Sequence, residues 1–189
     1  MSDFFDRALP EVQKTIELLR KKKFRLDPIG GEKYSRSTSV ISSAYKRHGS
    51  IIEAAIRERL KDNDNFVVWD ERSFKVSQAA TNILSGTDED CLGASLKYGD
   101  EVRTLQVDLI VYDKTRRTLR AYEVKRGNGS FDSGKKRSIM RDLLSTHVLL
   151  KSYGETRGLK VDSAESMIIF YYGIRSIPKP FSLTGDETR

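Results

Sequence analysis

Two short apolar segments joined by a polar turn constrain the fold of this chain more than any other feature. Residues 105–112 and residues 119–125 are rich in β-branched, aromatic and other apolar side chains, whereas the intervening residues 113–118 are polar. Segments of this composition separated by such a short loop predict two adjacent antiparallel strands. We therefore expect a β-hairpin over residues 105–125.

Side chains alternate between the two faces of a strand, so the hairpin also predicts which residues lie together. On the second strand, Glu123 and Lys125 share one face with Ala121, while Tyr122 and Val124 point to the opposite face, the expected core side.

On the first strand, the same alternation places Asp108 on a face with Gln106 and Ile110, opposite a second apolar set: Leu105, Val107, Leu109 and Val111. Two carboxylates and an ammonium group can therefore converge at one place on the sheet. That geometry is typical of a metal site and is not required for folding.

An acidic residue on one strand and Glu-x-Lys on the next resembles the PD-(D/E)XK nuclease superfamily. Residues 109–122 separate Asp108 from Glu123, a spacing that such a hairpin allows, although Val107 stands where the family name has proline. The resemblance covers residues 48–173 as an order of elements: helix, three strands, helix, strand. It implies an α/β fold with a restriction-endonuclease-like core, in which helices flank a central mixed sheet of about 4–5 strands, with extra N-terminal helices.

The resemblance also implies a site. Asp108, Glu123 and the Val124 carbonyl would bind Mg²⁺, for which Mn²⁺ can substitute, because hard oxygen ligands suit these ions. The metal would activate a water molecule and neutralise charge on the scissile phosphate. Lys125 would hold the attacking water and stabilise the developing negative charge. The alternative is a surface salt bridge between Asp108 and Lys125 on a solvated face.

A helix over residues 48–60 contains a candidate third acid. Many members of the superfamily place a glutamate from the first core helix beside the metal, and Glu53 is the matching residue. However, Ser50 and Glu53 also form an S-x-x-E capping box, which explains both residues without any chemistry.

Basic residues crowd the start of a second predicted helix, over residues 135–151. Cations near a helix N-terminus oppose the helix dipole, so phosphate binding is the simpler explanation for them. The alternative is a solvated charged face. The four candidate nucleic-acid contacts are Lys135, Lys136, Arg137 and Arg141.

Local patterns predict the remaining elements. These are a helix over residues 9–24 with Pro10 in its first turn, a short helix over 38–47 joined at Gly49 to a helix over 50–61, a strand over 66–76, an acidic loop over 86–99, and a central strand over 166–172.

The whole chain limits the class of protein. Its 189 residues suit one domain, divided into a helical extension (1–47), a catalytic core (48–173) and a C-terminal tail (174–189) whose last residues are expected to be loose. The net charge of +7 favours a polyanionic partner. No apolar run is long enough to predict a membrane span, and the start of the chain lacks signal-peptide character. The single cysteine, Cys91, allows no internal disulfide and is expected in a loop. We therefore expect a cytoplasmic protein.

Together these features predict a Mg²⁺-dependent DNA endonuclease that uses no small-molecule cofactor. A Type II restriction endonuclease, acting as a homodimer on double-stranded DNA, fits a chain of this length. A repair, recombination or phage nuclease of the same fold, or a nucleic-acid-binding module without catalysis, is the alternative.

Overall fold

The computed structural model describes residues 2–23, 25–83, 88–127 and 129–188. The chain divides into two compact units, Met1–Arg59 and Leu60–Arg189. The boundary between them lies near the end of a long helix, and Glu53 belongs to the first unit.

The second unit is built on a five-stranded mixed sheet with the strand order β1-β2-β3-β4-β5. The first three strands pair antiparallel, whereas β3, β4 and β5 pair parallel. The α/β class, the mixed sheet and the antiparallel hairpin are therefore as predicted. The strands are β1 (Phe66–Val76), β2 (Arg103–Asp113), β3 (Thr118–Lys125), β4 (Ser163–Phe170) and β5 (Ser182–Thr184).

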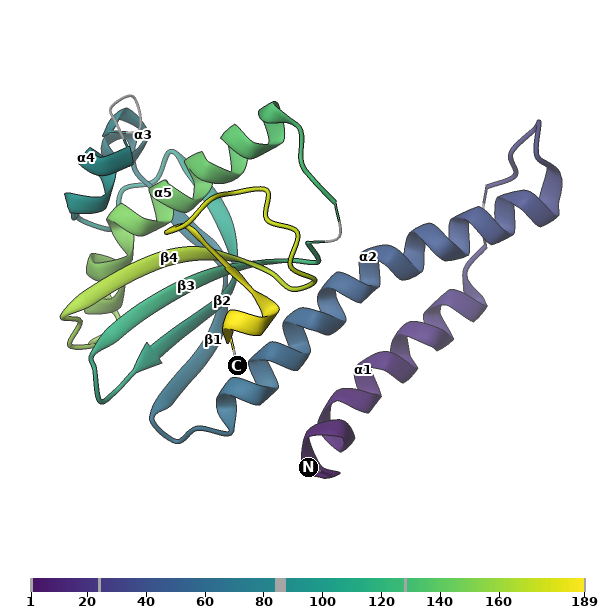
Figure 1. Ribbon diagram of the computed structural model, residues 1–189, viewed down its shortest axis with the longest axis horizontal. Helices are drawn as coiled ribbons and strands as arrows, with labels where there is room; N and C mark the ends of the chain where they lie inside the picture. The colour runs from purple at the N-terminus through teal and green to yellow at the C-terminus, as the bar shows by residue number, and fades with distance from the viewer. Residues whose placement is uncertain (1, 24, 84–87, 128, 189) are drawn as a thin grey trace. The chain divides into compact units, whose positions relative to one another are not determined.

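Helix α5 (Ser133–Thr156) lies across one face of this sheet (Figure 1). Its Val148, Leu149 and Leu150 are fully buried in a core shared with Leu119 and Ala121 of β3. The sequence-based choice of the core side was therefore wrong, because Ala121 and not Val124 faces the principal core. Both faces of β3 carry buried residues, as expected for an interior strand, and alternation alone cannot rank two buried faces.

The connection between β1 and β2 contains two short helices, α3 (Gln78–Ile83) and α4 (Asp88–Gly93). Only α4 contradicts the prediction, since it lies within residues 86–99, where an acidic loop was expected. Residues 84–87 lie outside the described residues. Cys91 is buried in the core within α4 and is not a loop residue. A small apolar side chain at the helix–core contact explains this position.

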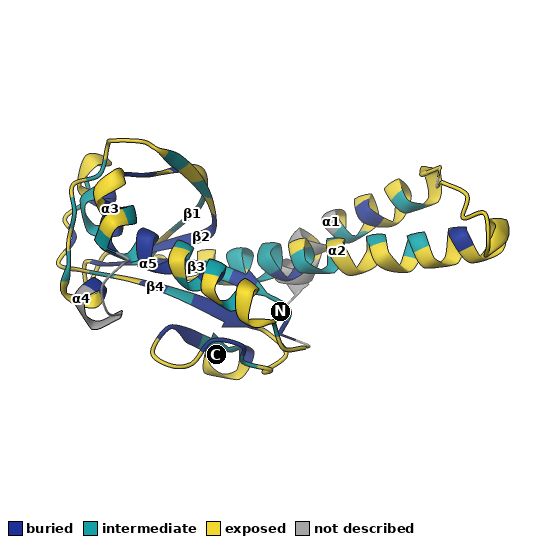
Figure 2. Ribbon diagram, turned by 90° about the horizontal axis from the view of Figure 1, so that it is seen from above, coloured by how far each residue is buried: buried dark blue, intermediate teal, exposed yellow. Residues whose placement is uncertain are grey.

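The first unit consists of helices α1 (Ser2–Lys21) and α2 (Gly31–Lys61). The expected break at Gly49 is absent, because α2 runs through it as one helix, and Pro10 lies inside α1 and not in its first turn. In the connecting loop, Asp27 accepts hydrogen bonds from the amides of Ile29 and Gly30. Most residues of this unit are exposed (Figure 2). Among the residues that the structure describes, no helix combines the length and apolar content needed to cross a bilayer.

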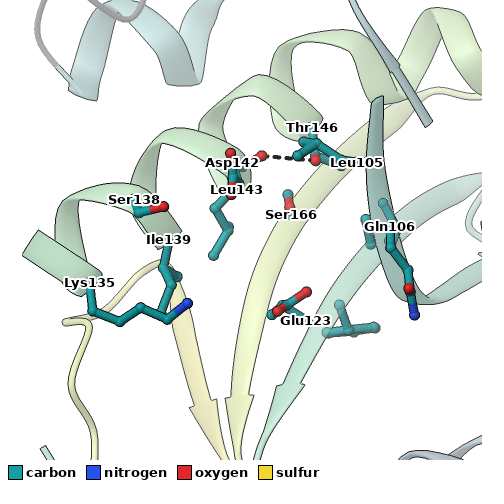
Figure 3. Close-up of a pocket in the computed structure, with 13 residues that line it drawn as sticks. Leu105, Gln106, Glu123, Lys135, Ser138, Ile139, Asp142, Leu143, Thr146 and Ser166 are labelled. Atoms are coloured by element: carbon teal, nitrogen blue, oxygen red, sulfur yellow. Dashed lines mark hydrogen bonds between the residues drawn. The ribbon is translucent and has the colours of Figure 1, made fainter. Parts of the chain in front are cut away.

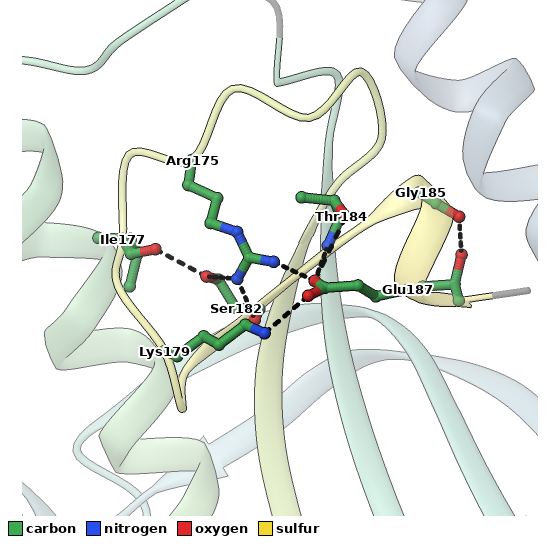
Figure 4. Close-up of polar contacts among 8 residues, drawn as sticks. Arg175, Ile177, Lys179, Ser182, Thr184, Gly185 and Glu187 are labelled. Atoms are coloured by element: carbon green, nitrogen blue, oxygen red, sulfur yellow. Dashed lines mark hydrogen bonds and ion pairs between the residues drawn. The ribbon is translucent and has the colours of Figure 1, made fainter.

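The C-terminal segment is folded where a loose tail was expected. Strand β5 adds to the sheet beside β4, and a 3₁₀ helix, η1 (Gly185–Thr188), follows it. Glu187 accepts hydrogen bonds from Arg175 and the Thr184 amide, and forms an ion pair with Lys179 at 2.7 Å (Figure 4). These contacts join the two ends of the segment, and local sequence patterns did not predict them.

Candidate active site

The structure brings Asp108, Glu123 and Lys125 together on the sheet. The Glu123 carboxyl group lies close enough to the Asp108 carboxyl group to interact with it electrostatically, and it forms an ion pair with the Lys125 ammonium group. Asp108 is buried, with 8% of its surface exposed, and its Oδ2 accepts a hydrogen bond of 2.9 Å from the Val124 amide. Two neighbouring strands thus hold Asp108 and Lys125 near the same carboxyl group, that of Glu123.

A β-bulge lies at Asp108 and changes the alternation of β2. One residue of β1 opposes two residues of β2, Asp108 and Leu109, between the paired positions Trp69–Ile110 and Glu71–Val107. As a result, Val107 and Ile110 belong to the same core, although they were predicted on opposite faces. Bulges re-aim side chains and occur frequently beside active sites. The orientation of the Asp108 side chain therefore depends on the pairing of β2 with β1.

The two carboxyl groups repel each other when both are charged. Burial raises the pKa of Glu123 above its usual value, the neighbouring Asp108 carboxylate acts in the same direction, and Lys125 partly opposes them. Raised acid pKa values of this kind are found where carboxylates share a site. A cation bound between the two groups would relieve this repulsion.

The donor set fits Mg²⁺. No group of three or more His, Cys, Asp and Glu side chains arranged for a metal occurs among the described residues. However, Mg²⁺ usually binds through one or two carboxylates, and substrate phosphate oxygens and water supply its other ligands. Asp108 and Glu123 provide those two carboxylates. The contact between Val124 and Asp108 is made by the Val124 amide N–H. It does not test the role of the Val124 carbonyl as a metal ligand, which remains a prediction.

Glu53, the predicted third acid, belongs to a different unit of the chain. It lies in the interior of α2 and belongs to the first unit, so the geometry described above does not include it. The capping-box explanation was also wrong, because α2 begins at Gly31 and neither Ser50 nor Glu53 lies at a helix start. A metal-binding role for Glu53 therefore stays a prediction.

A pocket of about 200 Å³ adjoins the site between α5 and the sheet (Figure 3). Glu123 lines it together with Lys135, whose side chain extends from the first turn of α5 in the direction of Glu123. The paired residues Ala121 and Ser166 form part of its floor, and their small size leaves the space open. The other lining residues include polar side chains that the sequence did not indicate: Gln106, Ser138, Asp142 and Thr146.

The four basic residues of α5 are not equivalent. Only Lys135 lines the pocket with Glu123, while Arg137 and Arg141 are exposed and Lys136 is half-buried. The N-cap Asp132 accepts a hydrogen bond of 2.8 Å from the Lys135 amide, and this bond lowers the pKa of Asp132. That carboxylate offsets the unfavourable position of the cations near the helix start. The sequence carried this signal, an aspartate three residues before Lys135.

The end of β4 also differs from its prediction. The strand stops at Phe170, and Tyr171 and Tyr172 are exposed in the turn that follows, although both were assigned to a covered central strand. Gly173, with a φ of 89°, marks this turn and was the available signal.

Comparisons with protein-family models, with curated proteins and with solved structures found no match to this chain. The assignment of a function therefore depends on the geometry of the site.

Proposed function

We propose that the unit Leu60–Arg189 is the catalytic part of a Mg²⁺-dependent nuclease with a restriction-endonuclease-like core. The observation that carries the proposal is that Asp108, Glu123 and Lys125 lie together on adjacent strands. The structure pairs Lys125 with Glu123 and not with Asp108, and such an ion pair alone would not require a second, buried carboxyl group beside it. A cation-binding site for phosphate chemistry explains all three residues.

Each residue has a distinct role in this proposal. Bound Mg²⁺ would supply charge neutralisation at the scissile phosphate and a more acidic water molecule. Asp108 and Glu123 would hold the ion, and the Val124 amide keeps the Asp108 carboxylate in a fixed orientation. The Lys125 ammonium group would stabilise the negative charge that develops as water attacks phosphorus. Lys135 would bind a neighbouring phosphate at the mouth of the pocket.

DNA is the proposed substrate. The first unit, Met1–Arg59, contains thirteen of the basic residues and eight of the acidic ones, so it carries most of the net positive charge. Lys22, Lys23 and Arg25 line a shallow groove in this unit, together with hydroxyl side chains: Thr38, Ser39, Ser42 and Ser43. Ammonium, guanidinium and hydroxyl groups are the usual donors to DNA phosphates. We propose that this helical unit supplies much of the sequence-independent affinity.

Within the nuclease class, we propose a Type II restriction endonuclease that cuts both strands as a homodimer with two symmetry-related sites. A repair, recombination or phage nuclease would use the same site.

The proposal is tested by incubating supercoiled plasmid with the full chain in Mg²⁺ or in EDTA. We expect cleavage only with Mg²⁺, and its loss in Asp108→Ala and Lys125→Ala. The matched control is Lys75→Ala, since Lys75 also lies in a strand and pairs with an acid, Glu101, at 3.3 Å. Cleavage that survives in either site variant would refute the assignment. Binding without cleavage by the unmodified protein would favour a non-catalytic module, and discrete fragments would support restriction-type specificity.

A further inference from the structure

Exposed apolar side chains are concentrated at the end of β4. Six large apolar side chains are exposed among the described residues of the second unit, and three of them, Tyr171, Tyr172 and Ile174, lie within four consecutive positions. The other three are scattered: Val67, Leu92 and Val102. Scattered exposed side chains need no explanation, whereas a local cluster marks an interaction surface.

This cluster lies directly beside the candidate active site. The Tyr171 amide donates to the Lys125 carbonyl at 3.0 Å, and the Tyr172 amide donates to the Arg126 carbonyl at 2.7 Å. The Ile174 amide continues the series with a bond of 2.9 Å to Gly127. The parallel pairing of β4 with β3 thus extends past Lys125, and the two tyrosines are held on a fixed backbone next to it.

Glycine at position 127 permits this close approach. Its φ is 67°, and a Cβ atom there would lie 2.7 Å from the Cβ of Phe170. A larger residue would push the tyrosine segment away from the end of β3. The closeness of the tyrosines to Lys125 is therefore built into the backbone.

The two rings are arranged so that aromatic surface stays open. Their centroids are 5.3 Å apart and their planes meet at 81°, edge to face. In this geometry the edge of one ring meets one face of the other, so only one of the four ring faces is used in the pair, and 42% of Tyr171 and 49% of Tyr172 are exposed. An open aromatic face next to a phosphate-binding site suits a nucleobase, because every base has a flat face that can stack on it.

We infer that Tyr171 and Tyr172 form a stacking platform for unpaired bases of the strand whose phosphate lies at the candidate active site. This inference depends on the proposed nuclease function and specifies its substrate. Bases within a duplex are already stacked on one another, so the platform requires a single strand or a locally opened duplex. The backbone carbonyls of Lys125 and Arg126 accept hydrogen bonds from the two tyrosine amides. The side chains of Lys125 and Arg126 would supply positive charge for the adjoining phosphates.

The test measures binding of labelled oligonucleotides to the full chain in EDTA, so that no cleavage is needed. Tyr171→Leu and Tyr172→Leu remove the aromatic rings but keep apolar side chains, and the matched Tyr→Phe variants keep the rings. We expect each Leu variant to bind a single-stranded oligonucleotide on the order of tenfold more weakly. The Phe variants should bind the single strand as the wild type does, and every variant should bind a duplex of the same length unchanged.

A second measurement tests the inference on the wild-type protein, so it does not depend on whether the Leu variants fold. Binding of the wild-type protein to a strand containing 2-aminopurine should quench the fluorescence of that base, because an aromatic ring stacks on it, and the Phe variants should quench it equally. Unchanged single-strand binding by the Leu variants, equal losses on both substrates, or no quenching by the wild type would overturn the inference. A wild-type protein that binds and quenches in EDTA but does not cleave in Mg²⁺ would refute the nuclease function alone.

Discussion

Asp108 has two properties that substitutions can separate: its negative charge and the hydrogen bond that it accepts from the Val124 amide. Replacement by alanine removes both. The buried amide is then left without its acceptor, which costs about 1–3 kcal/mol of folding free energy. Replacement by asparagine removes the charge but keeps a side-chain oxygen that can accept the same bond. Burial is the main cause of the raised pKa of Glu123, and both variants remove the smaller contribution from the Asp108 charge, so the difference between them reports on what the asparagine oxygen retains, chiefly the hydrogen bond from Val124.

The expected magnitudes can be measured by thermal unfolding. A free-energy change of about 1 kcal/mol moves the melting temperature by roughly 2–4 °C in a chain of this size. In EDTA at neutral pH, Asp108→Ala should therefore melt roughly 2–12 °C below Asp108→Asn, which should match or exceed the wild-type protein. Both variants should lose Mg²⁺-dependent cleavage, because each removes a charged ligand.

Two results would refute this reasoning. Equal destabilisation by the two substitutions would mean that the bond to Val124 does not hold Asp108 in place. Cleavage by Asp108→Asn at the wild-type rate would mean that the carboxylate charge is not needed, and the metal assignment would then be wrong.

Three further predictions address the rest of the chain. Because the pKa of Glu123 is raised in the fold, its stabilising contribution is complete below the ordinary value of 4.5 and is lost as the pH rises through the folded pKa. In EDTA, the melting temperature of Glu123→Gln should therefore rise relative to that of the wild type as the pH rises. Added Mg²⁺ should stabilise only the wild type. Melting temperatures that change in parallel with pH in the two proteins would contradict this. Removing Lys23 and Arg25 together should reduce the slope of log affinity against log salt by about 0.9 for each lost phosphate contact, and an unchanged slope would exclude this groove as a DNA contact. Bonds from Lys179, Thr184 and Arg175 lower the pKa of Glu187 to about 2, so the C-terminal contacts should persist to well below pH 4.5 and weaken only near the folded value. Glu187→Gln should accelerate tryptic cleavage after Arg175, and equal cleavage rates in the two proteins would show that Glu187 does not hold the segment.

The part of the site that follows from the sequence is the part that depends on one strand. Glu123 and Lys125 share a face because they are two residues apart in β3, and no other element is needed to place them. Asp108 is different. The direction of the Asp108 side chain depends on a bulge created by pairing with β1, about forty residues earlier in the chain. Alternation of side chains along β2 alone cannot predict such a bulge.

Long-range contacts explain the other misplaced elements. The C-terminal segment has a polar, proline-containing sequence typical of a loose end, yet Glu187 ties it back to Arg175 and Lys179. In the first unit, Gly49 resembled a helix joint and Ser50 a helix cap. A single glycine inside a helix costs only about 1 kcal/mol, however, and the residues on either side of it continue α2. Turn and cap signals predict boundaries only where the neighbouring residues do not extend the helix through them.

The hairpin loop, which contains none of the proposed catalytic residues, has a direct effect on the site. A slip of one residue between β2 and β3 would move Glu123 and Lys125 to the wrong positions relative to Asp108, because side chains alternate between faces. Asp113 limits such a slip, since its Oδ1 accepts hydrogen bonds of 2.9 Å from the amides of both Thr115 and Arg116. Arg117 closes the turn with a φ of 51°, and Asp113 then pairs with Thr118 to start the ladder. The polar residues that first indicated a hairpin in the sequence are therefore also the residues that set the register on which the three-residue site depends.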